Sequence, residues 1–193
     1  MKMYKYFFKR LLDILLALFI IILISPLLLV VFVLIKLDSR GPIFFLQQRV
    51  GKHGIKFFVY KLRTMTHKER VTTSEIFKDN PEVTRIGYIM RRLKIDELPQ
   101  FFNVLLGDMS LVGPRPALPQ LYEKYPEISK DRLLVRPGIT GWAQVHGNIY
   151  LSWEDRFRLD SFYVHHLTFG MDVRVFLKTL AVVVVGEDKF IQK

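Results

Sequence analysis

The feature that most constrains this chain is an uncharged apolar run of 22 residues, Ile14–Ile35, interrupted only by Ser25-Pro26. A straight helix of that length measures roughly 33 Å, which is enough to cross the hydrocarbon core of a bilayer. The run is too long for the apolar region of a cleaved signal peptide, and no small-residue cleavage site follows it. The sequence therefore predicts a membrane element near the amino terminus.

Two membrane topologies fit this run. Proline removes a backbone donor and clashes with the preceding turn, at a cost of about 3 kcal/mol in a helix interior, so Pro26 is expected to bend the helix. The Ser25 hydroxyl can hydrogen-bond a carbonyl that the bend frees. One topology is a spanning anchor kinked at Pro26, and the other is a re-entrant helix that enters and leaves the membrane on the same side.

The charges on either side of the run separate these topologies. Both flanks are basic, and the positive-inside rule then places both in the cytoplasm, which a re-entrant helix satisfies and a span does not. Arg10 and Asp13, at i and i+3, are predicted to pair near the headgroups. The basic residues are Lys2, Lys5, Lys9 and Arg10 before the run and Lys36, Arg40, Arg49 and Lys52 after it.

The length and net charge of the chain limit the number of domains and the kinds of partner that it can have. The 193 residues have room for one soluble domain beside the membrane element, so we expect a membrane element with its basic flank over residues 1–36 and one domain over 37–193. The net charge of +11 indicates an anionic partner: nucleic acid, lipid headgroups or phosphorylated substrates. Cysteine is absent, which excludes disulfides and thiolate metal sites and suits a cytoplasmic domain.

The domain is predicted to have a mixed α+β fold, because short runs of branched and aromatic residues alternate with helical patterns. The expected elements are strands at Ile43–Phe45 and Phe57–Leu62 around a turn at Gly51–Gly54, a polar surface loop at Thr66–Asn80, helices at Pro81–Arg92, Ala117–Tyr125 and Ser152–His166, and a turn and strand at Arg136–Val145. Ser152 is the expected N-cap of the last of these helices. The apolar segment Asp172–Val185 either packs on the core or lies in the membrane interface.

Two adjacent carboxylates, Asp96 and Glu97, precede a predicted helix. Asp96 fits the N-cap and Pro99 the first turn, so the helix dipole would keep a carboxylate ionised there. The plain alternative is a capped, half-buried helix with only a structural role. The apolar face expected to pack inward consists of Leu98, Phe101, Phe102, Leu105 and Leu106.

Basic side chains accompany this acidic pair. Lys61 and Arg63 are expected on one face of the second strand, where they anchor a phosphate or form an exposed basic edge. Arg91 lies five residues before Asp96 and either clusters with it or ends a helix in solvent. Carboxylates with Mg²⁺ commonly serve phosphate chemistry, and an aspartate can attack phosphorus directly. The residues indicate a membrane-bound enzyme that acts on phosphates.

The ordered motifs resemble those of one family, the monotopic phosphoglycosyl transferases, also called bacterial sugar transferases, over nearly the whole chain. The motifs are KRLLD, Ser25-Pro26, GPIFFLQQRVGKHGIKFFVYKLRTM, TRIGYIMRRLKIDELPQFFNVLLGDMSLVGPRP and RPGITGWAQV. The resemblance implies a re-entrant helix bent at Ser25-Pro26, followed by a small α/β catalytic domain with amphipathic interface helices on the cytoplasmic face of the bacterial inner membrane. The chain is expected to be the minimal catalytic form of the family.

The resemblance also implies a reaction. A sugar-1-phosphate moves from a UDP-sugar to undecaprenyl phosphate, giving undecaprenyl-diphosphate-sugar and UMP, as the first membrane step of exopolysaccharide, capsule, O-antigen or glycoprotein glycan synthesis. The implied partners are the UDP-sugar, undecaprenyl phosphate, membrane phospholipids and downstream glycosyltransferases, with no nucleic acid. Mg²⁺ is the implied cofactor.

The same resemblance assigns the site residues. Asp96 becomes the nucleophile of a covalent phosphosugar intermediate, and Glu97 positions the metal or the lipid phosphate, with both carboxylates at the metal. The basic positions around the phosphates are Arg91, Arg115, Lys61 and Arg63; the nucleotide-sugar loop would use Arg136, Gly138, Thr140 and Gln144; and the membrane re-entry would involve Ser25, Pro26, Arg10 and Asp13. The chain departs from the family after Val145, where His146-Gly147-Asn148 stands in place of Asn-Gly-Arg.

Three alternatives remain open. A membrane-tethered nucleic-acid binder explains the charge but not the DELPQ and GPRP motifs, and it predicts salt-sensitive DNA binding. A non-catalytic membrane scaffold would tolerate Asp96→Asn. Within the enzyme class, a ternary-complex transfer that uses Asp96 only as a metal ligand competes with the covalent route.

Overall fold

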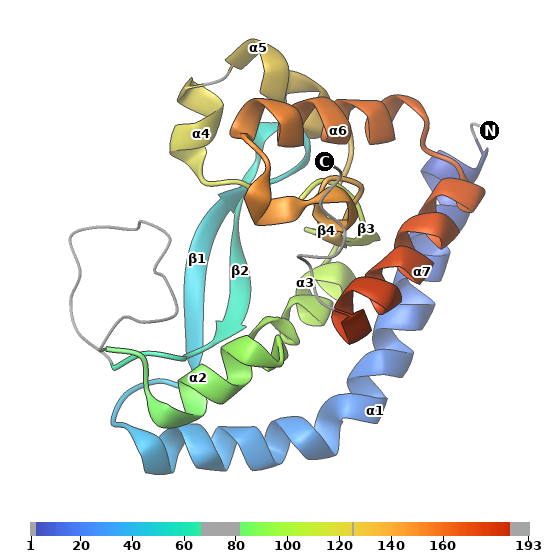
Figure 1. The fold of residues 1–193 in the computed structure, drawn as a ribbon. Helices are drawn as coiled ribbons and strands as arrows, with labels where there is room; N and C mark the ends of the chain where they lie inside the picture. Colours follow the sequence, from blue (N-terminus) through green and yellow to red (C-terminus); the bar gives the residue numbers. More distant parts are fainter. Residues whose placement is uncertain (1–2, 67–81, 125, 186–193) are drawn as a thin grey trace.

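Helix α1 (Lys9–Asp38) contains the whole predicted membrane run and extends beyond it at both ends. The computed structural model describes residues 3–66, 82–124 and 126–185, so almost all of the predicted loop at Thr66–Asn80 lies outside it. Pro26 lies inside α1, and the Ser25 hydroxyl donates to the Ile22 carbonyl at 2.9 Å, as predicted. Figure 1 shows the ribbon of α1 bending, so that its two halves follow two sides of the molecule.

One face of α1 packs on the rest of the chain along both halves. Ala17 is buried against β2 and α3, and Leu28, Val31 and Ile35 are buried against Leu62 and other residues. Among the described residues, α1 is the helix that is long and apolar enough to cross a membrane. Its other face is exposed and apolar, and includes Leu15, Leu16, Phe19, Ile22, Leu23, Leu27, Leu29, Val30, Val33 and Leu37.

The predicted strand pair is confirmed as an antiparallel hairpin of β1 (Phe44–Val50) and β2 (Lys56–Leu62). The first strand runs five residues further than predicted. The short helical turn η2 (Lys52–Gly54) joins the strands, with His53 at φ 58° and Gly54 at φ 78°. These left-handed angles reverse the chain where the GKHG motif predicts a turn.

A second, parallel sheet was not predicted. It pairs β3 (Ser110–Val112) with β4 (Gly138–Thr140) and joins two segments that are distant in sequence. The backbones are in direct contact beyond the strands: a Cβ on Gly138 would lie 2.1 Å from the Gly113 nitrogen. Glycine is therefore required where the GPRP segment lies against the RPGITG segment.

The helices complete the mixed α+β fold, which is confirmed at that level. Ser152 caps α6 as predicted, because its hydroxyl accepts from the Asp155 N–H. Helix α2 begins four residues later than predicted, after Thr84, whose hydroxyl accepts from the Gly87 N–H. The remaining elements are η1 (Tyr4–Phe8), α2 (Arg85–Arg92), η3 (Ile95–Glu97), α3 (Gln100–Leu106), α4 (Pro119–Lys124), α5 (Pro126–Ser129), η4 (Lys130–Leu134), η5 (Gln144–His146), η6 (Asn148–Tyr150), α6 (Trp153–His165) and α7 (Phe169–Val185).

Helix α7 lies beside the first half of α1 (Figure 1). Its first turns pack on the core, where Met171, Asp172 and Val175 are buried near Tyr163 of α6. Its later residues leave large apolar side chains exposed, including Phe176, Leu177, Leu180, Val183 and Val184. The first turns of the helix therefore carry its buried residues, while Thr179, further along, still contacts the Thr140 hydroxyl of β4 at 2.7 Å.

Candidate active site

The acidic pair does not cap a helix, so that prediction is wrong. Asp96 and Glu97 lie in the short 3₁₀ turn η3, which follows Lys94 in the left-handed region at φ 57°. Helix α3 begins only at Gln100, with Pro99 at its N-cap. Asp96 and Glu97 therefore lie four and three residues before α3 instead of at its N-cap.

The inward face of α3 also differs from the prediction. Phe102 and Leu106 are exposed, whereas Gln100, Asn103 and Val104 are buried. The fully buried Asn103 joins α3 to β2, since its Oδ1 accepts from the Tyr60 N–H at 3.0 Å and its amide donates to the Phe58 carbonyl at 2.8 Å. Sequence reasoning missed this residue, although it bonds α3 to the strand that carries Lys61.

Two cations hold Glu97. The Lys61 ammonium donates to Oε1 at 2.9 Å, and Arg115 donates to both oxygens, at 2.7 Å to Oε1 and 3.3 Å to Oε2. Burial alone would raise the pKa of Glu97, but Arg115 and Lys61 outweigh it and hold the pKa well below its usual range. Glu97 is therefore a carboxylate at neutral pH.

Asp96 is in a different environment. Among the described residues no other side chain donates a hydrogen bond to its carboxylate. Burial, and then the neighbouring Glu97 charge, raise the pKa of Asp96, while Lys61 and Arg91 oppose the rise. Arg91 is itself positioned by a hydrogen bond from its Nε to the Thr64 hydroxyl at 2.9 Å. The structure therefore brings five of the predicted site residues together: Asp96, Glu97, Lys61, Arg91 and Arg115.

A second arginine, Arg132, contacts the backbone of Arg115. Arg132 donates to the Arg115 carbonyl, and its Nε lies 2.9 Å from Asp160 Oδ2. Both partners are almost fully buried, and burial raises the pKa of Asp160 to about 6 despite the arginine. Neither residue was predicted, because a lone arginine and a lone aspartate on separate elements give no local pattern.

The predicted nucleotide-sugar loop lies against the segment that carries Arg115. The Thr140 carbonyl accepts from the Gly113 N–H at 2.8 Å, and the Gly138 N–H donates to the Pro114 carbonyl at 2.9 Å. Gln144 donates to the Ile139 carbonyl at 3.0 Å, within the same loop. Arg136 donates from Nε to the Gly107 carbonyl at 2.7 Å, at the end of α3. These contacts are structural, and direct contact with a nucleotide stays a prediction.

Arg63 lies apart from the acidic pair. It is buried, and its guanidinium donates to the carbonyls of Ile35, Ser39 and Arg40 at 3.2, 2.6 and 2.7 Å. These acceptors are at the carboxyl end of α1, where a cation complements the orphan carbonyls. The structure therefore gives Arg63 a helix-capping position, while Lys61, two residues before it, reaches Glu97.

Arg10 and Asp13 reach different partners instead of pairing with each other as predicted. Arg10 donates to the carbonyls of Val104 and Leu105 at 2.6 and 3.0 Å, at the end of α3. Asp13 accepts from the Ser110 hydroxyl at 2.7 Å and from the Leu111 N–H at 3.1 Å. Both side chains therefore attach α1 to the domain.

The cations around the acidic pair suit reaction at an anionic group. Within the described residues, no group of three or more histidine, aspartate or glutamate side chains could hold a metal ion. The site places Asp96, which accepts no hydrogen bond from another described side chain, beside Glu97, which two cations hold. Lysine and arginine surround both carboxylates. Such cations can stabilise the oxygens of a transferring phosphoryl group.

Comparison with known proteins assigns the chain to a family. The family model described as bacterial sugar transferase matches residues 4–186. The chain belongs to the bacterial sugar transferase family. The predicted family and the predicted transferase class are thereby confirmed, and this family membership disfavours both the nucleic-acid binder and the inert scaffold.

Three relatives illustrate the likeness. The uncharacterized sugar transferase EpsL of Bacillus subtilis (strain 168) is 43% identical over 179 residues, which cover 93% of this chain and 88% of that protein. The UDP-N-acetylgalactosamine-undecaprenyl-phosphate N-acetylgalactosaminephosphotransferase of Aeromonas hydrophila is 43% identical over 93% of this chain and 44% of its own length. The UDP-glucose:undecaprenyl-phosphate glucose-1-phosphate transferase of Escherichia coli (strain K12) is 38% identical over 89% and 39%. This bacterial sugar transferase thus spans less than half of the latter two relatives.

Proposed function

We propose that the protein transfers a sugar-1-phosphate from a UDP-sugar to undecaprenyl phosphate, forming undecaprenyl-diphosphate-sugar and UMP. The names of the Aeromonas and Escherichia relatives support the donor and acceptor classes. The observation that carries the proposal is the division within the acidic pair: two cations hold Glu97, whereas no other described side chain donates to Asp96. A carboxylate without such a donor can act as a nucleophile.

The proposed chemistry has two displacements at one phosphorus. A carboxylate oxygen of Asp96 attacks the phosphorus that carries the sugar, and the bond to the bridging oxygen breaks, so that UMP leaves with the electron pair. A phosphate oxygen of undecaprenyl phosphate then attacks the same phosphorus, and Asp96 leaves as a carboxylate. Arg115, Lys61 and Arg91 provide positive charge around the transferring oxygens.

Mg²⁺ belongs to this proposal through the donor. Magnesium sites that serve phosphate chemistry commonly use one or two carboxylates plus the substrate phosphates. Asp96 fits such a ligand, while Oε1 of Glu97 already accepts from Lys61 and Arg115, which leaves Oε2 as the better placed oxygen. When bound, the ion would neutralise charge on the diphosphate.

We also propose that α1 is re-entrant, with the domain on the cytoplasmic face of the inner membrane. Both ends of α1 attach to the same domain: Arg10 donates to the end of α3, and Asp38 accepts from the Ile86 N–H of α2 at 3.0 Å. A spanning helix would hold its two ends on opposite sides of the bilayer. UDP-sugars are cytoplasmic, so the product would serve glycosyltransferases that extend a surface glycan.

Cysteine labelling tests this topology, because the chain has no cysteine of its own. A cysteine introduced at Lys2 is expected to stay on the side of the domain, and the double change Ser25→Ala with Pro26→Ala is expected to move it across, since it removes the cause of the bend. A cysteine at exposed Lys56 of β2 serves as the domain-side control. Identical labelling at position 2 in both proteins would contradict the re-entrant bend.

A UMP-release screen tests the reaction. The full chain in membranes or detergent is supplied with undecaprenyl phosphate, Mg²⁺ and, in turn, UDP-glucose, UDP-galactose and UDP-N-acetylgalactosamine. We expect UMP with at least one donor, and a lipid-linked diphosphate product in equal amount. UMP release from none of a wide panel of UDP-sugars would overturn the proposed donor class.

A further inference from the structure

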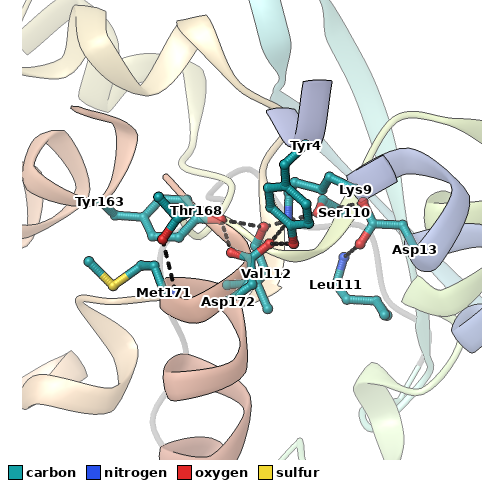
Figure 2. A network of polar contacts seen from close by, with 10 residues as sticks. All are labelled: Tyr4, Lys9, Asp13, Ser110, Leu111, Val112, Tyr163, Thr168, Met171 and Asp172. Atoms are coloured by element: carbon teal, nitrogen blue, oxygen red, sulfur yellow. Dashed lines mark hydrogen bonds and ion pairs between the residues drawn. The ribbon is translucent and has the colours of Figure 1, made fainter. Parts of the chain in front are cut away.

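A buried polar network joins the start of α1 to α7 and β3 (Figure 2). Asp172 of α7 accepts from the Lys9 ammonium and the Tyr4 hydroxyl, each at 2.6 Å, and from the Tyr163 hydroxyl at 2.7 Å. Asp13, one turn after Lys9, accepts from β3. The network lies outside the acidic pair, and nothing in the proposed chemistry uses it.

The network holds all three residues of β3. Asp13 accepts from the Ser110 hydroxyl at 2.7 Å and from the Leu111 N–H at 3.1 Å. The Tyr163 hydroxyl lies 3.1 Å from the Val112 carbonyl while it donates to Asp172. Asp13, Ser110 and Tyr163 are buried, so these contacts are shielded from water and strengthened accordingly.

A stiff connection leads from β3 to Arg115. Gly113 and Pro114 are bonded to the backbone of the neighbouring loop, through the Thr140 carbonyl and the Gly138 N–H. Prolines on both sides of Arg115 fix the backbone φ angle at those positions. Only two residues separate Val112 from Arg115, so a displacement of β3 is passed to the arginine that holds Glu97.

We infer that Asp13 and Tyr163 are positioning residues, which act through β3 and the GPRP segment to place Arg115 on Glu97. The membrane helix thereby sets the geometry of the acidic pair. The inference rests on the proposed function for its catalytic consequence, but the placement of Arg115 can be measured without any substrate.

The first test measures Arg115 directly. Phenylglyoxal modification of Arg115 is followed by peptide mass spectrometry in the full chain without donor or acceptor. Asp13→Asn and Tyr163→Phe are each expected to raise the rate of Arg115 modification by about threefold or more. A change of that size corresponds to the smaller interaction energies found between residues of one hydrogen-bond network. Exposed Arg158 is the internal reference, and Glu127→Gln is the control, because it also neutralises a carboxylate but does so in an exposed pair with Lys130.

The expected result is faster modification at Arg115 with an unchanged rate at Arg158 in both network variants, and no change at either arginine in Glu127→Gln. Unchanged modification of Arg115 in both network variants would overturn the inference. If Asp13→Asn does not fold, Ser110→Ala removes one hydroxyl from the same contact, and a wild-type rate at Arg115 in that variant together with Tyr163→Phe would overturn it equally.

A double-mutant cycle in sugar-phosphate transfer is the second test. Asp13→Asn is expected to lower kcat about tenfold in the wild-type background. The loss is expected to be less than about threefold when Arg115→Lys has already removed the guanidinium contact with both oxygens of Glu97. An equal loss in both backgrounds means that Asp13 acts on stability alone, which contradicts the inference. If Arg115 responds in the modification test but no UDP-sugar is turned over, the proposed function fails and the positioning role stands.

Discussion

The molecule contains two pairs of carboxylates set among cations, and they differ in how completely they are bonded. In the network of Figure 2, Asp13 and Asp172 accept hydrogen bonds on both oxygens, from Ser110, Leu111, Tyr4, Lys9 and Tyr163. In the candidate active site only Glu97 is held in this way. The difference teaches that carboxylates with hydrogen bonds on both oxygens hold elements of the fold together. Asp96 has no donor from another described residue, which suits the nucleophilic role proposed for it.

Among the substitutions that test this comparison, Asp96→Asn is expected to have the largest effect. An amide is a poor nucleophile, so sugar-phosphate transfer is expected to fall by about a thousandfold or more. The melting temperature is expected to change little, because the side chain makes no bond to another described residue that the change would remove. UMP release and thermal unfolding measure the two effects, and a variant that keeps most of its activity would remove Asp96 from the mechanism.

Asp172→Asn is expected to show the opposite pattern. It leaves the buried Lys9 ammonium without its counter-charge, and breaking one partner of a buried pair costs about 3 kcal/mol of unfolding free energy. Denaturant unfolding measures that loss. Glu127→Gln is the control, because it breaks an exposed pair with Lys130 and should change the free energy of unfolding little. Equal costs for the two variants would mean that the buried network does not stabilise the fold.

The smallest effect concerns pH. Burial and Glu97 raise the pKa of Asp96, and Lys61 opposes this, so Lys61→Met raises the pKa further. A nucleophile must be ionised, so the acid limb of the kcat profile is expected to move to higher pH. Lys56→Met removes the same charge from an exposed position on β2 and should leave the limb in place. A limb that stays in place or moves to lower pH in Lys61→Met would contradict the assignment of Asp96.

Local patterns predicted the parts of the fold that depend on neighbouring residues. The apolar run, the hairpin around GKHG and the Ser152 cap are confirmed, since each is written in a few consecutive residues. The strand predicted within Arg136–Val145 is confirmed as β4, but its pairing with β3 was not predicted, because β3 has only three residues and lies in a distant segment. The helix cap at Asp96 was wrong, because left-handed Lys94 inserts a 3₁₀ turn that the sequence pattern does not indicate.

The candidate site was predictable in its chemistry and only partly in its geometry. Alternation along β2 placed Lys61 and Arg63 on one face, but Lys61 reaches Glu97 while Arg63 caps α1. Tertiary contacts decide between these positions, and the sequence pattern carries no information about them. The same holds for Arg132 and Asp160, whose pairing behind Arg115 depends on the packing of η4 on α6.

The central claim is that Asp96 becomes covalently attached to the sugar phosphate. The most direct measurement incubates the full chain with the UDP-sugar that releases UMP, without undecaprenyl phosphate, then quenches in acid and maps the protein by mass spectrometry. We predict one sugar phosphate on the peptide that contains Asp96, in equal amount with UMP and lost when undecaprenyl phosphate is added. UMP release that requires the lipid acceptor, with no adduct on a protein that turns over, would contradict the account.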